Sequence, residues 1–305
     1  MIRRMLGVAL FLTACAPDGE IDDVDVELAG LDESAEERGT DALVRLTGAG
    51  DIARCDYDGD DRVATLLDGI GGTIFTAGDN AYTRGTLAEY QSCYEPSWGR
   101  HKARTKPSPG NHEYYSGANG YFDYYGESAG PRGRGYYSYR LGEWLVLSLN
   151  SEVDAGENSA QVAWVKQEIA ANPTKCAMAY LHKPLMSSGP HGANPSLRPL
   201  YRALYDGGVD VVVAGHDHDY ERFLKTDADG NRDEKHGFRL FVVGTGGSPL
   251  YNLENQHPLS TRWQNHAHGV MRFTLYADKY YFKFMPVAGS SYSDQGYRVC
   301  TDPHP

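Results

Sequence analysis

Seven side chains of the kinds that bind metal ions occur in five short motifs along the chain. They are Asp51, Asp79 with Tyr82, Asn111, His182, and His216 with His218. Four of these motifs follow apolar runs, whereas Asn111 follows a Pro-rich loop. Loops at strand ends gather catalytic groups from distant parts of an α/β enzyme, so we expect the seven side chains to ring one edge of a sheet. Such a set can hold two metal ions, which makes metal-dependent chemistry the first hypothesis.

The spacing of the histidines and the position of the glycines support this hypothesis. His216 and His218 are two residues apart, so on an extended backbone both imidazoles project the same way. Glycine stands directly before Asp79 and Asn111, where it permits the tight turn that aims a short side chain inward. A second His-x-His, His266 with His268, lacks such a glycine turn and an adjoining acidic motif, and we interpret it as structural or as part of the surface.

The ordered motifs resemble those of the calcineurin-like metallophosphoesterase superfamily and, within it, those of the purple acid phosphatases. The chain reads Gly50-Asp51, Gly78-Asp79-x-x-Tyr82, Gly110-Asn111-His112-Glu113, Ala179-x-x-His182 and Gly215-His216-x-His218. Only Ala179, which is not a ligand, departs from the family's valine. Many superfamily members have Asp-x-His in the first motif, where this chain has Ala53, and Tyr82 would replace that missing ligand. This replacement indicates the purple subgroup, and the resemblance covers about residues 42 to 301.

The resemblance implies a four-layer α/β/β/α sandwich with two mixed β-sheets, and two metal sites that share Asp79. One site would consist of Asp51, Asp79, Tyr82 and His218, and the other of Asp79, Asn111, His182 and His216. The hard oxygens of the first site suit Fe(III), and the second would accept Zn(II), Fe(II) or Mn(II). The implied reaction is in-line hydrolysis of a phosphate ester by a hydroxide that the metals generate.

Further residues have weaker assignments. By resemblance, His112 is the proton donor to the leaving group, and the alternative is a histidine that only orients Asn111. His191 is either a phosphate contact or an ordinary loop residue, and Glu113 would support the site. The basic stretch 100 to 104 would draw anionic substrates to the cleft or, as we favour, form a solvated turn. The acidic loops 56–60 and 227–231 lack the residues of a calcium loop, and we interpret them as turns.

We expect three segments along the chain. Residues 1–14 resemble a signal peptide, and Leu12-Thr13-Ala14-Cys15 resembles a bacterial lipobox that would place a lipid on Cys15; the alternative is an ordinary secretory signal. Residues 15–41 are strongly acidic and without aromatic side chains, which is typical of a disordered tether. Residues 42–305 would form the catalytic domain. The chain would then be an exported, lipid-anchored protein of a bacterial cell envelope, without the N-terminal sandwich domain of the plant enzymes.

The acidic segment carries most of the formal charge of −12, so the remainder is only mildly acidic. This leaves no basic platform for nucleic acid, and the sequence specifies no oligomeric state. Four cysteines follow Cys15, an even number in a chain that leaves the reducing cytoplasm. They permit three pairings, of which we favour Cys55 with Cys93 and Cys176 with Cys300.

Hydrophobic patterning indicates a layered α/β body with helices outside. We expect helices from near Ser159 and over the stripe Leu197 to Leu204, the second ending at Gly207-Gly208. Strands are predicted at residues 43–48, 73–77, 144–149, 177–181, 209–214, 239–244, 269–275 and 279–285.

The function that the sequence favours is a dinuclear metal-dependent phosphatase acting on small phosphomonoesters. A phosphodiesterase or nucleotidase with the same metal site is the alternative enzyme. A surface lipoprotein that binds metal without catalysis is the alternative from another class, and it is disfavoured because such proteins usually lose ligands.

Overall fold

The computed structural model describes residues 44–253 and 255–301, which contain two β-sheets. The predicted signal peptide, lipid-bearing Cys15 and tether fall outside these residues. The six-stranded sheet has the order β13 (Gln295–Val299), β12 (Lys279–Pro286), β11 (Gly269–Leu275), β1 (Val44–Ala49), β2 (Thr73–Ala77) and β3 (Thr105–Ser108). The seven-stranded sheet has the order β10 (Ser260–Gln264), β8 (Tyr220–Thr226), β9 (Phe238–Val243), β7 (Val211–Ala214), β6 (Ala177–Tyr180), β5 (Trp144–Ser148) and β4 (Tyr137–Leu141).

Both sheets are mixed, and each has a parallel core. In the first sheet β1, β2 and β3 run parallel, whereas β11, β12 and β13 are antiparallel to their neighbours. In the second sheet β5, β6, β7 and β9 run parallel, and β4, β8 and β10 are antiparallel. Parallel strands place their carboxyl ends at the same edge, which is the edge at which α/β enzymes gather functional loops.

Alternation along β5 shows how the layers form. Val146 belongs to the core that also contains Phe75 and Phe273 of the other sheet. Its neighbours Leu145 and Leu147 point the opposite way, into a second core lined by helices. Successive side chains of a strand face opposite sides, so a fully buried strand must be covered on both. The predicted four-layer α/β/β/α sandwich with two mixed sheets is confirmed.

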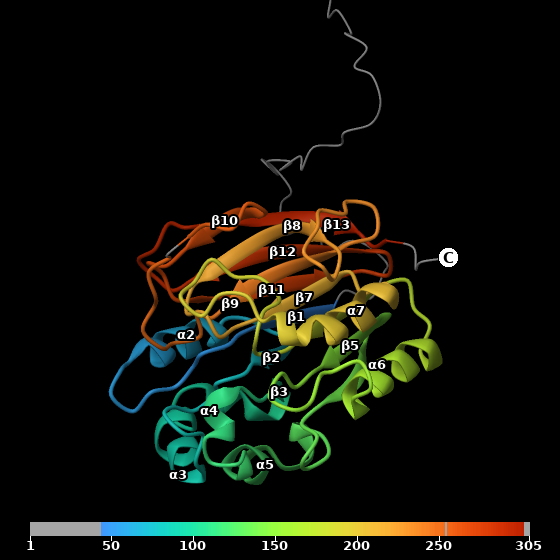
Figure 1. Cartoon of the computed structure of the whole chain (residues 1–305). Coiled ribbons are helices and arrows are strands. Elements are labelled where there is room, and N and C mark those ends of the chain that lie inside the picture. The colour runs from blue at the N-terminus through green and yellow to red at the C-terminus, as the bar shows by residue number, and fades with distance from the viewer. Residues whose placement is uncertain (1–43, 254, 302–305) are drawn as a thin grey trace, which may run out of the picture.

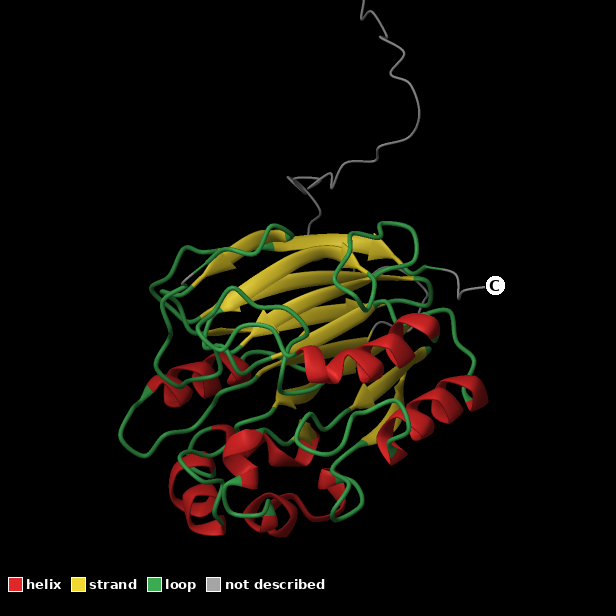
Figure 2. Cartoon of the chain, viewed as in Figure 1, coloured by secondary structure: helices red, strands yellow, loops and turns green. Residues whose placement is uncertain are grey.

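The helices lie outside the sheets (Figure 1; Figure 2). In Figure 1, α6 (Ala160–Ala171) and α7 (Arg198–Asp206) lie near each other, and their apolar residues cover the seven-stranded sheet. On the other sheet α2 (Gly59–Asp68) packs against β11. The short helices α3 (Leu87–Glu89), α4 (Asn111–Tyr114) and α5 (Asn119–Tyr125) gather at one end of the molecule. Within the described ranges no helix combines the length and apolar character needed to cross a bilayer.

Both predicted helices are present, and their ends have physical causes. The side chain of Ser159 accepts the N–H of Val162, so Ser159 is the N-cap of α6. Helix α7 stops before Gly207 and Gly208, and Gly208 has a φ of +71°. A left-handed residue just past a helix end is favoured by glycine.

The eight predicted strands are present with ends shifted by at most two residues, but five further strands escaped prediction. These are β3, β4, β8, β10 and β13. All five lie at or next to a sheet edge, where fewer apolar side chains are buried and the periodic signal weakens. The residues of β4 are only partly buried or exposed. Strand β8 also contains buried charged residues, which interrupt its apolar pattern.

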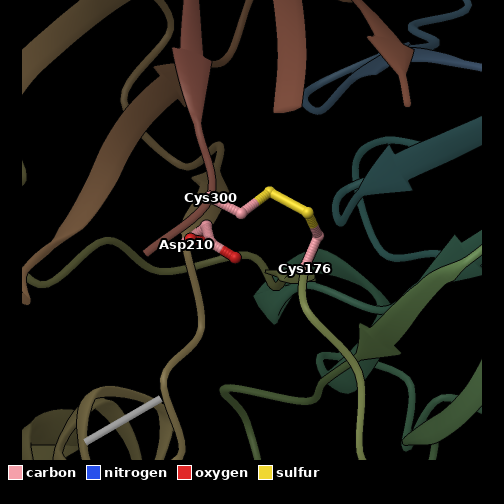
Figure 3. Close-up of side chains that lie close together, drawn as sticks. All are labelled: Cys176, Asp210 and Cys300. Carbon is pink, nitrogen blue, oxygen red and sulfur yellow. A yellow bond between two sulfur atoms is a disulfide. The ribbon is translucent and has the colours of Figure 1, made fainter. Parts of the chain in front are cut away.

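Two disulfides join the predicted pairs. Cys55 bonds Cys93 with a Cα separation of 5.0 Å, and Cys176 bonds Cys300 with a Cα separation of 5.5 Å. The second bond fastens the end of β13 to the start of β6, and Asp210 lies beside it (Figure 3). The sulfurs are bonded to each other, so this cluster is a structural junction. Disulfides are consistent with export from the reducing cytoplasm.

Candidate metal centre

The candidate ligands lie just beyond the carboxyl ends of parallel strands from both sheets. Asp51 follows β1 and Asp79 follows β2 in one sheet, whereas His182 follows β6 and His216 follows β7 in the other. We predicted that the seven side chains ring one edge of a single sheet. This was wrong, because they follow strands of both sheets. A single sheet edge would spread the motifs along a line, whereas two facing edges bring them into one cluster.

Asn111 also follows a strand, which the sequence analysis did not predict. The Pro-rich loop before it contains β3, which pairs in parallel with β2 and includes Pro107. Proline is tolerated on an edge strand because its missing N–H would have no partner there. All five motifs therefore lie just after the carboxyl end of a parallel strand.

One half of the cluster is centred on the phenol of Tyr82. Its Oη donates to Asp51 Oδ1 at 2.8 Å and lies 3.2 Å from Asp79 Oδ2 and 3.0 Å from His218 Nε2. All four side chains are buried. Burial and the charges of Asp51 and Asp79 raise the pKa of Tyr82 well above its usual value, so without a cation the phenol stays protonated.

The other half is centred on His182. Its Nε2 lies 3.0 Å from Asn111 Oδ1, 3.1 Å from His216 Nδ1 and 3.2 Å from Asp79 Oδ2. Asp79 Oδ2 is the atom that both halves share. Two sets of four donor atoms joined by one carboxylate oxygen are the arrangement that a pair of bridged metal ions requires.

Backbone carbonyls fix which ring nitrogens face the centre. His182 Nδ1 donates to the carbonyl of Ala77 at 2.9 Å, and His218 Nδ1 donates to that of Pro249 at 2.8 Å. Each contact places the N–H on Nδ1 and directs Nε2 into the cluster. Histidine ligands are commonly oriented through their second nitrogen in this way.

The backbone is strained where it presents these ligands. Among the described residues four that are not glycine have positive φ, and three are Asp51 at 62°, Asp79 at 49° and His216 at 75°. Such conformations cost of order 1–3 kcal/mol each and cluster at functional sites. Strain of this kind supports a functional origin for the cluster.

The glycines before the ligands serve mainly to leave space. A Cβ on Gly110 would lie 2.3 Å from Asp79 Oδ1, and one on Gly215 would lie 2.5 Å from Asp51 Oδ2. Gly110 has extended backbone, so the turn predicted from its glycine is absent there. Gly78 has a left-handed backbone, with a φ of +77°, and also no space for a side chain, because a Cβ there would lie 2.5 Å from the His182 side chain.

The electrostatics of the cluster favour a cation. Burial opposes the charge on Asp79, but the adjacent His182 outweighs it and holds the pKa of that carboxyl well below its usual range. Burial likewise opposes protonation of His182, yet Asp79 raises the pKa of its ring. Burial and the neighbouring His182 lower the pKa of His216 to about 2. Carboxylates, a phenol, an amide oxygen and imidazole nitrogens converge here, and this donor set fits metal ions.

Glu113 supports the loop that carries Asp79, as the sequence analysis predicted. Its carboxylate accepts backbone N–H groups of Asp79, Asn80, Ala81 and Gly110 at 2.7–3.3 Å, and the hydroxyl of Tyr90 at 3.1 Å. Glu113 is fully buried. Burial and the charge of Asp79 raise its pKa to about 8.

His112 lies at the rim of the cluster and faces the cavity above it. Its Nδ1 donates to the carbonyl of Thr83 at 2.7 Å, and its Nε2 lies 3.8 Å from Asp79 Oδ2. About a quarter of the His112 side chain is exposed. With Nδ1 occupied by Thr83, Nε2 is the ring nitrogen that remains for a contact in the cavity that His112 lines.

His191 lies over the other rim. Its ring stacks on that of His216 with centroids 4.3 Å apart and an angle of 23°. Asp217, between the two histidines of the last motif, accepts the backbone N–H of His191 at 2.9 Å and the hydroxyl of Ser187. Asp217 thus joins the His191 loop to the His216 loop, a role that the sequence analysis missed.

Four of the seven candidate ligands, Asp79, Asn111, His216 and His218, line a cavity of about 520 Å³. Residues that line it beyond the predicted ones are Tyr114, Tyr115, Glu152, Lys183, Asn194 and Tyr251. Tyr251 stacks on His218 with centroids 3.9 Å apart. Lys183 adjoins His182 in sequence, which is the one signal that could have found it, whereas Tyr251 and Glu152 belong to other segments.

Three weaker candidates have structural roles. Arg104 donates to the carbonyls of Leu67 and Ile70 at the end of α2, and Arg100 pairs with Asp68 at 2.9 Å. His268 Nε2 lies 2.9 Å from the carbonyl of Ser248. In the loop 227–231, Asp227 accepts backbone N–H groups within the loop, as expected of a turn.

The sequence matches the model of the calcineurin-like phosphoesterase family over residues 44–220, which is more than half of the chain. The chain belongs to this family. It is 29% identical over 147 residues to "Probable purple acid phosphatase 20" of Arabidopsis thaliana, covering 46% of the chain and 32% of that protein. It is 27% identical over 216 residues to "Purple acid phosphatase 15" of the same plant, covering 58% and 40%. The chain thus spans less than half of the length of these curated relatives.

A solved structure shows the same fold. The purple acid phosphatase PPD1 from yellow lupin (Lupinus luteus) seeds matches 85% of this chain and 54% of its own, with a TM-score of 0.66 and 19% identity. The sequence relatives and the fold together confirm the purple acid phosphatase-like subgroup. Membership of this family supports a phosphoester hydrolase.

Proposed function

We propose that the chain is a dinuclear metal-dependent phosphatase that hydrolyses phosphomonoesters. The observation that carries this proposal is the shared position of Asp79 Oδ2, which lies 3.2 Å from Tyr82 Oη in one half of the cluster and 3.2 Å from His182 Nε2 in the other. Asp51, Asp79, Tyr82 and His218 would hold one ion, for which Fe(III) is the best fit. Asp79, Asn111, His182 and His216 would hold the second, Zn(II), Fe(II) or Mn(II).

Bound metal ions would activate water and stabilise the charge of an in-line displacement. Two residues of the chain would donate the proton and bind the phosphate. His112 Nε2, facing the cavity, donates a proton to the leaving oxygen. His191, fixed by Asp217, hydrogen-bonds a phosphate oxygen from the opposite rim. Residues 42–305 constitute the catalytic domain in this proposal, and a lipid on Cys15 would hold it at the cell envelope.

The test uses two ligand variants and a matched control. Asp79→Ala and His216→Ala are expected to lose at least about 100-fold of the activity on 4-nitrophenyl phosphate, because each removes a donor atom of the centre. His266→Ala changes a histidine of the second His-x-His and should keep full activity. Full activity in both ligand variants would end the proposal.

A further inference from the structure

Lys183 and Glu152 form an ion pair on the wall of the cavity that contains the metal centre. Lys183 Nζ donates to Glu152 Oε2 at 2.7 Å, with a quarter of the lysine side chain exposed and the glutamate side chain 8% exposed. Of the described residues that line the cavity, Lys183 is the one lysine or arginine. Lys183 is therefore the permanently charged cationic side chain among the described residues of this cavity.

The backbone around Lys183 is fixed on both sides. Its N–H donates to Ser151 Oγ at 3.1 Å, and its carbonyl accepts the hydroxyl of Tyr201 at 3.1 Å. Ser151 also donates to Glu152 Oε1 at 2.8 Å, so one serine positions both members of the pair. A fixed backbone beside the ligand His182 holds the ammonium group at a defined place on the wall.

The ammonium group has spare hydrogen-bonding capacity. A lysine ammonium carries three N–H donors, and within the described residues Lys183 uses one of them, to Glu152. A substrate oxygen can therefore accept a second N–H without breaking the pair. Such charge-assisted hydrogen bonds are about twice as strong as neutral ones.

We propose that Lys183 selects dianionic phosphomonoesters over monoanionic phosphodiesters, an inference that rests on the proposed function. A phosphomonoester carries close to two negative charges at neutral pH, and a diester carries one. In the diester an esterified oxygen replaces the terminal oxygen that would accept the lysine N–H. Selectivity arises because the Lys183 ammonium lacks a substrate oxygen as acceptor when a phosphodiester binds. Glu152 holds the ammonium in place and keeps it from the carboxylates of the centre.

The experiment compares Lys183→Met, Lys183→Arg and Glu152→Gln in the full, metal-loaded chain at pH 7.5. The substrates are 4-nitrophenyl phosphate and bis(4-nitrophenyl) phosphate, which share a leaving group. Lys183→Met should lower kcat/KM for the monoester about tenfold and for the diester less than about twofold, and Lys183→Arg should restore most of the loss. Lys166→Met, an exposed lysine on α6, is the matched control and should change neither value.

Binding of inorganic phosphate, measured by calorimetry, gives a readout apart from turnover. Lys183→Met should weaken phosphate binding about tenfold, whereas Glu152→Gln should strengthen it, because the lysine keeps an acceptor and loses its counter-charge. If the pair is only structural, both variants weaken phosphate binding together, and the proposal is overturned. Equal losses on the two esters also overturn it. If Lys183→Met fails to fold, Lys183→Gln replaces it in both assays.

Failure of the proposed function is recognised separately. A wild-type protein that binds two metal ions but hydrolyses neither ester would refute the phosphatase assignment. The phosphate-binding comparison would still decide whether Lys183 is the anion contact.

Discussion

Glu113 accepts the backbone N–H of Asp79 at 3.0 Å, so a buried carboxylate fixes the residue that joins the two halves of the metal centre. Glu113→Ala would leave five donors without a partner. We expect it to lower the free energy of unfolding by at least about 3 kcal/mol and to reduce bound metal, measured by urea unfolding and elemental analysis. The matched control is Glu168→Ala on α6, which removes an acceptor for the hydroxyl of Ser138 at 2.6 Å and for the amide of Asn172 at 2.9 Å. It should cost about 1 kcal/mol with no loss of metal. Equal metal content in both variants would contradict this role.

His112 should matter in proportion to the basicity of the leaving group. Its Nε2 faces the cavity, and a proton donor accelerates departure of an alkoxide much more than that of 4-nitrophenolate. We expect His112→Asn to lower kcat by about 10²-fold or more on an alkyl phosphate and by far less on 4-nitrophenyl phosphate. Equal losses on both substrates would favour the alternative, in which His112 only orients Asn111.

The disulfide between Cys176 and Cys300 should stabilise the fold more than that between Cys55 and Cys93. The two bonds close sequence separations of 124 and 38 residues, and a longer loop loses more entropy when closed. The loop-closure relation gives about 5 and about 4 kcal/mol respectively. Urea unfolding of the two Cys→Ser double variants measures the order, and a larger loss for the shorter loop would contradict it.

Asp210 should make stability depend on pH. Burial raises its pKa to about 6, so between about pH 4 and 6 the folded state keeps a proton that the unfolded chain has released. Its contribution to stability is full below pH 4 and is lost as pH rises through 6. Relative to Asp210→Asn, which cannot titrate, the wild type should lose roughly 1–3 kcal/mol between pH 4 and 7. Urea unfolding at both pH values checks this, and a constant difference would contradict it.

Much of the candidate site could be predicted because its signals are local. Glycine directly before Asp79, Asn111 and His216 reflects contacts with other ligands, since a Cβ at each position would collide with the centre. The strands that carry most motifs are buried on both faces and therefore read as apolar runs, such as Val211 to Ala214.

The remaining features depend on the tertiary fold. Strand β3 was missed because Pro107 in an edge strand looks like a loop. Nothing in the sequence joins Lys183 to Glu152, which are 31 residues apart, or places Tyr251 on His218. Pairing of β5 with β6, and of β9 with β7 and β8, within the seven-stranded sheet creates these contacts, and the pattern along the chain does not report which strands become neighbours.

Elemental analysis of the purified full chain, with the visible spectrum recorded on the same sample, tests the dinuclear metal centre most directly. We expect two metal ions per chain, one of them iron, with a visible absorption band from tyrosinate that disappears in Tyr82→Phe. We also expect Asp79→Ala to lose both ions. A folded wild-type protein that binds no more metal than Asp79→Ala would show that these residues form no metal centre.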